Sequence, residues 1–374
     1  MQIVVNTRLL IKNRLEGIGG FTYHTLRVLT EKCPDWHFIF LFDRDFDESF
    51  IFGDNVTPVI LTPQARHPVL FYIWFDYSVA QFLKLVKPDL FLSPDGYLSL
   101  RTVVPQIAVI HDINYMHHPA DIPWVNRWYY RHFFPKFAQK AARVVTVSEF
   151  SKQDIVKEFE VDANKVDVVY NGVDKIFKPI GQLEREAIKA HYAVGWDYFV
   201  FVGALHPRKN IGRLLQAYDA FRKRSGEKVK LVLVGKKMWW TKELELAFEG
   251  MNYKEDVIFT GRLETEALAK VVAASLALVY VSYFEGFGVP ILEGFAAGTA
   301  VITSSVTSMP EVAGGAALLV DPYDVDEITA GLIKLATDKA YRDKLIATGL
   351  KRQAAFSWER TSNLLLDSIM RVVG

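Results

Sequence analysis

Residues 276–304 read LALVYVSYFEGFGVPILEGFAAGTAVITS. An apolar run stands at each end, and a glycine-rich loop followed by a third apolar stretch lies between them. The runs LALVYVS (276–282) and AVITS (300–304) predict buried strands. Pro290 predicts the start of a helix, because proline at the first helical position has no amide hydrogen to leave unpaired. A strand, a helix and a second strand in this order form the unit of parallel α/β sheets, so the stretch predicts an α/β fold.

The same alternation of apolar runs and amphipathic stretches fills both halves of the chain. The runs include QIVVN (2–6), FIFLF (38–42), DLFLS (89–93), QIAVI (106–110), YFVFVG (198–203), KLVLVG (230–235) and VIFTG (257–261). Asn-Gly and a proline in VVYNGVDKIFKP (168–179) mark a boundary. We therefore expect two Rossmann-like domains, 1–174 and 175–356, whose parallel sheets face each other across a cleft, with a C-terminal helix at about 357–374 crossing back to the first.

Composition narrows the class of protein. The 374 residues carry 44 Lys or Arg against 43 Asp or Glu, and a net charge of +1 argues against a general nucleic-acid partner. The single cysteine, Cys33, cannot form an internal disulfide, which fits a reducing compartment. MQIVVNTRLL shows no signal-peptide pattern, and no run of 18 apolar residues predicts a membrane span. We expect a cytoplasmic protein, with the inner face of a membrane as a further location to test.

The segment EGFGVPILE (285–293) contains the strongest candidate site. Glu285 follows a predicted strand, at the edge where open α/β sheets bind ligands. The amides of Gly286, Phe287 and Gly288 precede the predicted start of a helix, a position that favours binding of an anion. Glu293 has a simpler alternative role, because an acidic residue in the first turn of a helix commonly just stabilises that helix. Two carboxylates repel a bare phosphate but accept hydrogen bonds from sugar hydroxyls. A nucleotide sugar, with a diphosphate between its two sugars, explains the whole segment.

EGFGVPILEGFAAGTAVITS (285–304) resembles the E-x7-E region of the retaining GT-B glycosyltransferases of family 4, also called glycosyl transferases group 1. The resemblance covers nearly the whole chain and is strongest from 198 to 321. It implies a GT-B fold and a retaining, metal-independent hexosyltransferase. It also implies that Glu293 binds the ribose, that Glu285 contacts the transferred sugar, and that the amides of 286–288 serve the sugar and diphosphate.

Two further segments follow predicted strands and match the same family. Arg208 and Lys209 in GALHPRKNIGRLL (203–215) precede a helix that Asn210 is expected to cap, and adjacent cations there suit a diphosphate. The resemblance likewise implies diphosphate binding by this pair. In GRLETEALAKVV (261–272) it implies that the backbone around Arg262 and Leu263 reads the base.

In the first half, Gly19 and Gly20 in LEGIGGFTYHTL (15–26) are expected to precede a helix after the first strand, where the backbone can approach a ligand. The resemblance places them near the diphosphate and the acceptor, and a plain turn is the alternative. His111 in VIHDINY (109–115) ends a predicted strand, and the resemblance implies contact with the donor sugar, with Asp112 orienting its ring. A hydrogen-bonded structural histidine is the alternative.

Other features of the sequence suggest other functions. Asp43-Arg44-Asp45 resembles the metal-binding D-x-D of the other glycosyltransferase fold, but acidic pairs after strands are common in solvated loops, so no metal is expected. A nucleotide-sugar epimerase of the same fold and a non-catalytic nucleotide-sugar-binding protein remain alternatives. A glycogen-phosphorylase-like enzyme is excluded because the chain is too short.

The sequence leaves the substrates open. GDP-mannose and UDP-glucose are both compatible donors, and the resemblance implies a glycan or lipid-linked acceptor in surface polysaccharide synthesis. The segment PWVNRWYYRHFFPKFAQKAARVV (123–145) holds seven aromatic residues and five Lys or Arg, with no acidic residue from 122 to 148. Such a segment suits a membrane interface, but a helix that packs its aromatics into the core has the same composition. Both interpretations remain open.

Overall fold

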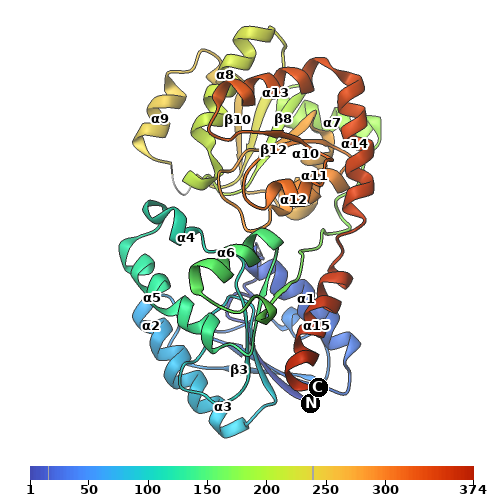
Figure 1. Cartoon of the computed structure of the whole chain (residues 1–374). Coiled ribbons are helices and arrows are strands. Elements are labelled where there is room, and N and C mark those ends of the chain that lie inside the picture. Colours follow the sequence, from blue (N-terminus) through green and yellow to red (C-terminus); the bar gives the residue numbers. More distant parts are fainter. Residues whose placement is uncertain (16, 238–239) are drawn as a thin grey trace. The chain divides into compact units, whose positions relative to one another are not determined.

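The computed structural model describes residues 1–15, 17–237 and 240–374. Contacts divide the chain into two compact units (Figure 1). The first unit comprises residues 1–172 together with 358–374, and the second comprises residues 173–357. The division after Gly172 falls inside the segment 168–179, and the division after Ser357 precedes the last helix of the chain.

The first unit is built on a seven-stranded sheet in which every neighbouring pair is parallel, in the order β3-β2-β1-β4-β5-β6-β7. Its strands are β1 (Gln2–Asn6), β2 (His37–Phe42), β3 (Val56–Ile60), β4 (Leu90–Ser93), β5 (Gln106–Val109), β6 (Arg143–Thr146) and β7 (Val166–Val168). Its helices are α1 (Ile18–Lys32), α2 (Pro68–Ile73), α3 (Ala80–Val86), α4 (Asn114–His117), α5 (Trp124–Lys140), α6 (Glu149–Phe159) and α15 (Trp358–Val373), with a π-helical turn η2 (Trp74–Val79) between α2 and α3.

Both faces of this sheet are buried, because successive side chains of a strand point to opposite faces. Ile3 and Val5 of β1 join one core with Phe21 of α1, whereas Val4 joins the other core with Trp74 and Phe137. Burial of both faces explains why the strands predicted from the sequence are unbroken apolar runs.

Helix α15 belongs to the first unit although it follows the second unit in the chain. Its Leu365 and Ile369 are fully buried in the core that contains β1 and α1. The ring of Trp358 stacks on His24 of α1, with centroids 4.5 Å apart. The Thr361 hydroxyl donates to the carbonyl of Tyr170.

One helical stretch in the described chain, Pro68–Val86, is long and apolar enough to cross a membrane by length and composition alone, although the sequence predicted no span. Core helices of soluble proteins meet the same criterion. Trp74, Phe75, Val79 and Leu83 of this stretch are fully buried in the core.

The second unit contains a six-stranded parallel sheet in the order β10-β9-β8-β11-β12-β13. Its strands are β8 (Tyr198–Val202), β9 (Lys230–Val234), β10 (Val257–Gly261), β11 (Ala277–Tyr280), β12 (Ala300–Ser304) and β13 (Leu318–Val320). Its helices are α7 (Gln182–Ala193), α8 (Ile211–Ser225), α9 (Lys242–Glu249), α10 (Thr265–Ala274), α11 (Val289–Ala296), α12 (Met309–Ala313), α13 (Val325–Thr337) and α14 (Lys339–Gln353). The expected pair of Rossmann-like domains with parallel sheets is confirmed.

Two glycines let helices of the second unit pack closely around α11. A Cβ atom on Gly294 would lie 2.8 Å from the Val301 side chain of β12. A Cβ atom on Gly349 of α14 would lie 2.6 Å from the ring of Phe295. Helix α11 is therefore held between β12 and α14 without room for a larger side chain at either contact.

Candidate active site

Glu285, Arg208 and Lys209 meet at the carboxyl edge of the second sheet. Strands β8 and β11 are parallel neighbours, so the segments that follow them leave the sheet at the same edge. Glu285 Oε1 accepts a hydrogen bond from Lys209 Nζ, and Oε2 accepts one from Arg208 Nη1, each at 2.6 Å. Glu285 and Lys209 are only 5% and 8% exposed. The structure therefore brings together three residues that the sequence predicted separately.

The charges of this ion cluster determine its chemistry. Burial alone would raise the pKa of Glu285, but attraction to Arg208 and Lys209 outweighs burial and lowers that pKa to about 2. The carboxylate is therefore ionised throughout the physiological range. Two cations and one carboxylate leave a net positive charge, which suits a diphosphate. In this arrangement the cations bind Glu285, so a bound diphosphate has to share them with that carboxylate.

Tyr280 completes the ion cluster, and the sequence analysis missed it. Its hydroxyl accepts a 2.6 Å hydrogen bond from Lys209 Nζ and is almost fully buried. Burial and the nearby Glu285 charge raise the pKa of Tyr280 well above its ordinary value, so the phenol stays protonated. Tyr280 and Glu285 together hold the ammonium group of Lys209 in place. A hydroxyl in the otherwise apolar run LALVYV was the only signal available.

Asn210 does not act as the expected helix cap. It occupies the N-cap position of α8 in the left-handed conformation, and its side chain makes no capping bond. Its Nδ2 instead donates to the carbonyls of Val281 and Pro322, at 3.0 and 2.7 Å. Asn210 thus ties the Arg208–Lys209 segment to the loops that follow β11 and β13.

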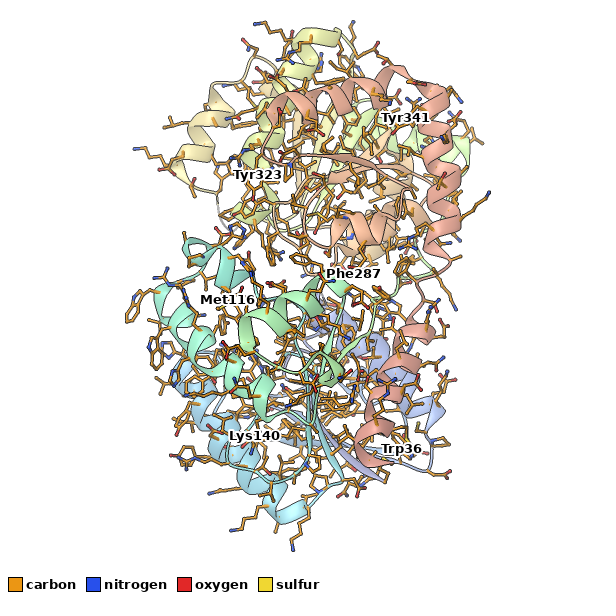
Figure 2. The ribbon with its side chains drawn as sticks, viewed as in Figure 1. Trp36, Met116, Lys140, Phe287, Tyr323 and Tyr341 are labelled. Atoms are coloured by element: carbon orange, nitrogen blue, oxygen red, sulfur yellow. The ribbon has the colours of Figure 1, made fainter. Side chains whose placement is uncertain are left out.

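The loop from Glu285 to Gly288 is supported by a serine of the next loop. Ser308 Oγ lies 2.8 Å from the carbonyl oxygen of Glu285 and 3.1 Å from that of Phe287, and shares its hydroxyl hydrogen between them. Gly288 precedes α11 at a φ of 98°, which favours glycine. Phe287, labelled in Figure 2, is buried. Its ring centroid lies 6.0 Å from that of Phe356. The use of the amides of Gly286, Phe287 and Gly288 for a ligand stays a prediction.

Glu293 lies in the second turn of α11, because the helix begins at Val289. Its expected place in the first turn was therefore wrong. The side chain is half-buried, and burial together with the negative charge of Asp174 raises its pKa to about 7. Glu293 and Glu285 are thus two carboxyl groups in opposite electrostatic environments.

Glycines end three adjacent strands at the same edge. Gly203, Gly235 and Gly261 follow or end β8, β9 and β10, with φ values of 143°, 152° and 70°. A Cβ atom on Gly235 would lie 1.9 Å from the carbonyl oxygen of Gly203, so no other residue fits. Arg262 and Leu263 follow this glycine row, and their predicted contact with a base stays a prediction.

In the first unit, His111 follows β5 and is held by two neighbours. Its Nε2 lies 2.9 Å from the carbonyl oxygen of Pro94, which can only accept, so Nε2 carries the hydrogen and Nδ1 remains an acceptor. The Phe21 ring contacts it edge-on at 5.1 Å, and burial lowers its pKa, which favours the neutral ring. The Asp112 carboxylate accepts the amide of Asn114. The Pro94 carbonyl is the hydrogen-bond partner that orients the ring, and an orienting role for Asp112 stays a prediction.

Gly19 and Gly20 lie inside the first turn of α1, which begins at Ile18, so their expected place before the helix was wrong. A Cβ atom on Gly19 would lie 2.9 Å from the carbonyl oxygen of Leu9. At Gly20 the nearest atom would be 3.7 Å away, so a side chain fits there. Gly19 has a packing role, whereas packing does not explain Gly20. Within the same predicted loop, Glu16 lies outside the described residues.

The Asp43-Arg44-Asp45 segment has a structural explanation. Asp43 is almost fully buried, its Oδ1 accepts Arg44 Nε at 2.6 Å, and its Oδ2 accepts the Ala65 amide at 2.9 Å. Among the described residues, no group of three His, Cys, Asp or Glu side chains could hold a metal ion.

Two Rossmann-like units and a cation–carboxylate cluster at a sheet edge are features of a GT-B glycosyltransferase. Residues 185–352 match the family described as Glycosyl transferases group 1, and residues 16–175 match Glycosyltransferase Family 4. The chain belongs to the group 1 glycosyltransferases of family 4.

Individual proteins agree with this membership. The O-antigen chain mannosyltransferase B of Escherichia coli is 30% identical over 287 residues, which cover 76% of this chain and 75% of that protein. The serotype-specific mannosyltransferase WbdA of Escherichia coli is 28% identical over 280 residues, 71% of this chain but only 33% of WbdA. The fold is similar to that of Anabaena Alr3699/HepE in complex with UDP and glucose, with a TM-score of 0.78 and 16% identity over 99% of this chain and 100% of that one.

Proposed function

We propose that this glycosyltransferase moves a hexose of the mannose or glucose type, with retention of configuration, from a nucleotide-diphosphate sugar to a glycan or lipid-linked acceptor. The observation that carries the proposal is the Glu285–Arg208–Lys209 cluster at the edge of β8 and β11. The names of the O-antigen chain mannosyltransferase B and of the serotype-specific mannosyltransferase WbdA support mannose as the transferred sugar, and the first supports a role in surface polysaccharide synthesis. A location at the cytoplasmic face of a membrane is part of the same proposal. The UDP and glucose of the Anabaena structure support the alternative donor, so GDP-mannose and UDP-glucose are both candidates.

In the proposed chemistry, positively charged side chains lie where the leaving group develops negative charge. As the bond between the anomeric carbon and the phosphate oxygen breaks, its electron pair passes to the diphosphate, which Arg208 and Lys209 stabilise without a metal ion. Tyr280 orients Lys209 before the donor binds, and the diphosphate then shares the ammonium group with Glu285. The acceptor oxygen attacks the anomeric carbon from the face that the phosphate leaves, so the configuration at that carbon is retained. The proton of the acceptor hydroxyl passes to the departing phosphate oxygen. Glu285 positions the sugar and is not the nucleophile.

The other predicted residues have binding roles in this proposal. Glu293 accepts hydrogen bonds from the ribose, and the backbone at Arg262 and Leu263 contacts the base beside the glycine row. Nδ1 of His111 accepts a hydrogen bond from a hydroxyl of the transferred sugar. The space beside the Cα atom of Gly20 accommodates the diphosphate or the acceptor. The segment 123–145 contacts a membrane that presents a lipid-linked acceptor.

Calorimetry with UDP, GDP and ADP, followed by UDP-glucose and GDP-mannose, tests the donor site. We expect tight binding of one diphosphate and of its sugar. Slow release of free hexose and diphosphate without an acceptor would distinguish an enzyme from a non-catalytic binding protein. An epimerase would instead convert the sugar while it remains attached to the nucleotide, which NMR detects. If none of these nucleotides binds, with or without added metal ion, the proposed donor site is wrong.

A further inference from the structure

Helix α5 has one face in the core and another in solvent. Tyr129, Phe134 and Phe137 are buried, whereas Trp124 and Trp128 are 72% and 59% exposed. The two tryptophans are four residues apart and therefore lie on the same face of the helix. The core thus explains only part of the aromatic content of the segment 123–145.

Cations lie on both sides of the two exposed tryptophans. At about 100° of rotation per residue, Arg127 and Arg131 fall on one flank of Trp128, and Lys136 and Lys140 fall on the other. Lys140 lies at the carboxyl end of the helix (Figure 2). Residues 122–148 contain no Asp or Glu, so no carboxylate from this segment neutralises them. From the neighbouring turn η2, the buried carboxylate of Asp76 interacts electrostatically with Lys140 and Arg101.

The exposed aromatic surface continues onto α2 and the π-helical turn η2. Ring centroids link Trp128 to Phe133 at 6.4 Å, Phe133 to Tyr72 at 6.0 Å, and Tyr72 to Tyr77 at 5.7 Å. The Arg101 guanidinium lies 4.1 Å from the centroid of Tyr77.

Two residues away from Arg101, Val103 is 99% exposed. Segment 96–111, which carries both residues, also lacks Asp and Glu. We call this surface the aromatic–basic face. It is defined by Tyr77, Arg101, Val103, Trp124, Trp128 and Arg131.

We propose that the aromatic–basic face binds the surface of a bilayer that contains anionic phospholipids. Indole rings have an apolar body and a polar N–H, which suits the headgroup region, and the flanking cations are complementary to anionic headgroups. A single-stranded nucleic acid would use the cations and could stack its bases on the tryptophans, but it would leave the exposed aliphatic side chain of Val103 unexplained. The inference deepens the proposed function, because a lipid-linked acceptor is presented at the same surface.

Co-sedimentation with vesicles tests the proposal on the full chain without nucleotide. We expect binding to vesicles of phosphatidylcholine with phosphatidylglycerol, and much weaker binding to phosphatidylcholine alone. Trp124→Ser with Trp128→Ser should weaken binding about tenfold or more. Arg131→Gln should weaken it roughly fivefold, since each cation near an anionic surface contributes about that factor.

The matched control is Leu183→Ser with Leu246→Ser, which removes two exposed leucines from the second unit and should leave vesicle binding unchanged. The proposal is overturned if the wild type does not bind anionic vesicles, if it binds neutral vesicles equally well, or if the tryptophan variant binds like the wild type. Circular dichroism verifies that each variant is folded.

Hydrolysis of UDP-glucose and GDP-mannose without vesicles separates this proposal from the proposed function. We expect the tryptophan variant to hydrolyse its donor at the wild-type rate. Donor hydrolysis without vesicle binding would overturn the proposal that the aromatic–basic face binds a membrane and would leave the transferase proposal standing. Vesicle binding without nucleotide binding or hydrolysis would overturn the transferase proposal and leave the membrane proposal standing.

Discussion

Replacing Lys209 with methionine tests the ion cluster most directly, because methionine keeps the length of the buried stem and removes only the ammonium group. The change removes two hydrogen bonds of 2.6 Å, one to Glu285 and one to Tyr280. Breaking a buried ion pair costs about 3–5 kcal/mol when the remaining charge has no other partner. Arg208 still binds Glu285 in the variant, so we expect a loss of roughly 2–3 kcal/mol in the free energy of unfolding.

The same substitution should reduce donor hydrolysis far more than stability explains. Removing one preorganised group that stabilises developing negative charge typically lowers kcat by about 10²–10³. We expect a decrease of this size at pH 7 under conditions where urea titration shows the variant folded. Lys223→Met, at an exposed lysine of α8, is the matched control and should change neither quantity.

A double-mutant cycle with Glu285→Gln identifies the origin of the stability change. If Lys209 stabilises the fold by neutralising the buried carboxylate of Glu285, the losses in unfolding free energy of the two single variants should be strongly non-additive in the double variant. The reason is that the uncharged amide of Gln at position 285 no longer needs a cation beside it. A folded Lys209→Met variant with a kcat within about threefold of the wild type would refute the proposed role in leaving-group stabilisation.

Four further outcomes are expected. Tyr280→Phe should lower kcat about tenfold while the protein stays folded, because one hydrogen bond to a charged group is lost, and wild-type kinetics would show that Lys209 needs no such support. Burial and Asp174 raise the pKa of Glu293 to about 7, above its unfolded value of 4.5, so this group favours the folded state below pH 4.5 and the benefit is lost as pH rises through 7. Stability should therefore fall between these values in the wild type but not in Glu293→Gln, as urea titrations across pH would measure. Gly20→Ala should stabilise the free protein by about 0.5–1 kcal/mol, as helix propensity predicts, and lower transfer, whereas Gly19→Ala should destabilise it because of the contact with the Leu9 carbonyl. EDTA should leave hydrolysis unchanged, and a large loss of rate after chelation would contradict the proposed metal-independent chemistry.

The fold was predictable because its signals are local. Unbroken apolar runs such as LALVYVS follow from burial of both faces of a parallel sheet, and Pro290 places the start of α11 within one residue. The candidate residues at strand ends were predictable for a related reason, since all parallel strands deliver their following loops to one edge.

The partners within the site were not predictable, because they depend on which strands are neighbours. Lys209 and Tyr280 are 71 positions apart, and only the pairing of β8 with β11 brings them together. Asp112 seemed the natural partner of His111 because it is adjacent in sequence, yet the Pro94 carbonyl orients the ring. A tyrosine in an apolar strand is usually a core residue, so its polar role became visible only with the position of the ammonium group.

The placement of α15 has a consequence for how the two units are made. The first unit needs residues 358–374, which a ribosome synthesises only after the whole second unit. During synthesis, the surface of the first unit that will receive Leu365 and Ile369 stays uncovered. The second unit is one continuous segment, 173–357, and can complete its own core first. A fragment of the second unit alone is therefore a reasonable target for expression and donor titration, whereas a fragment ending at residue 172 would lack one of its own core helices.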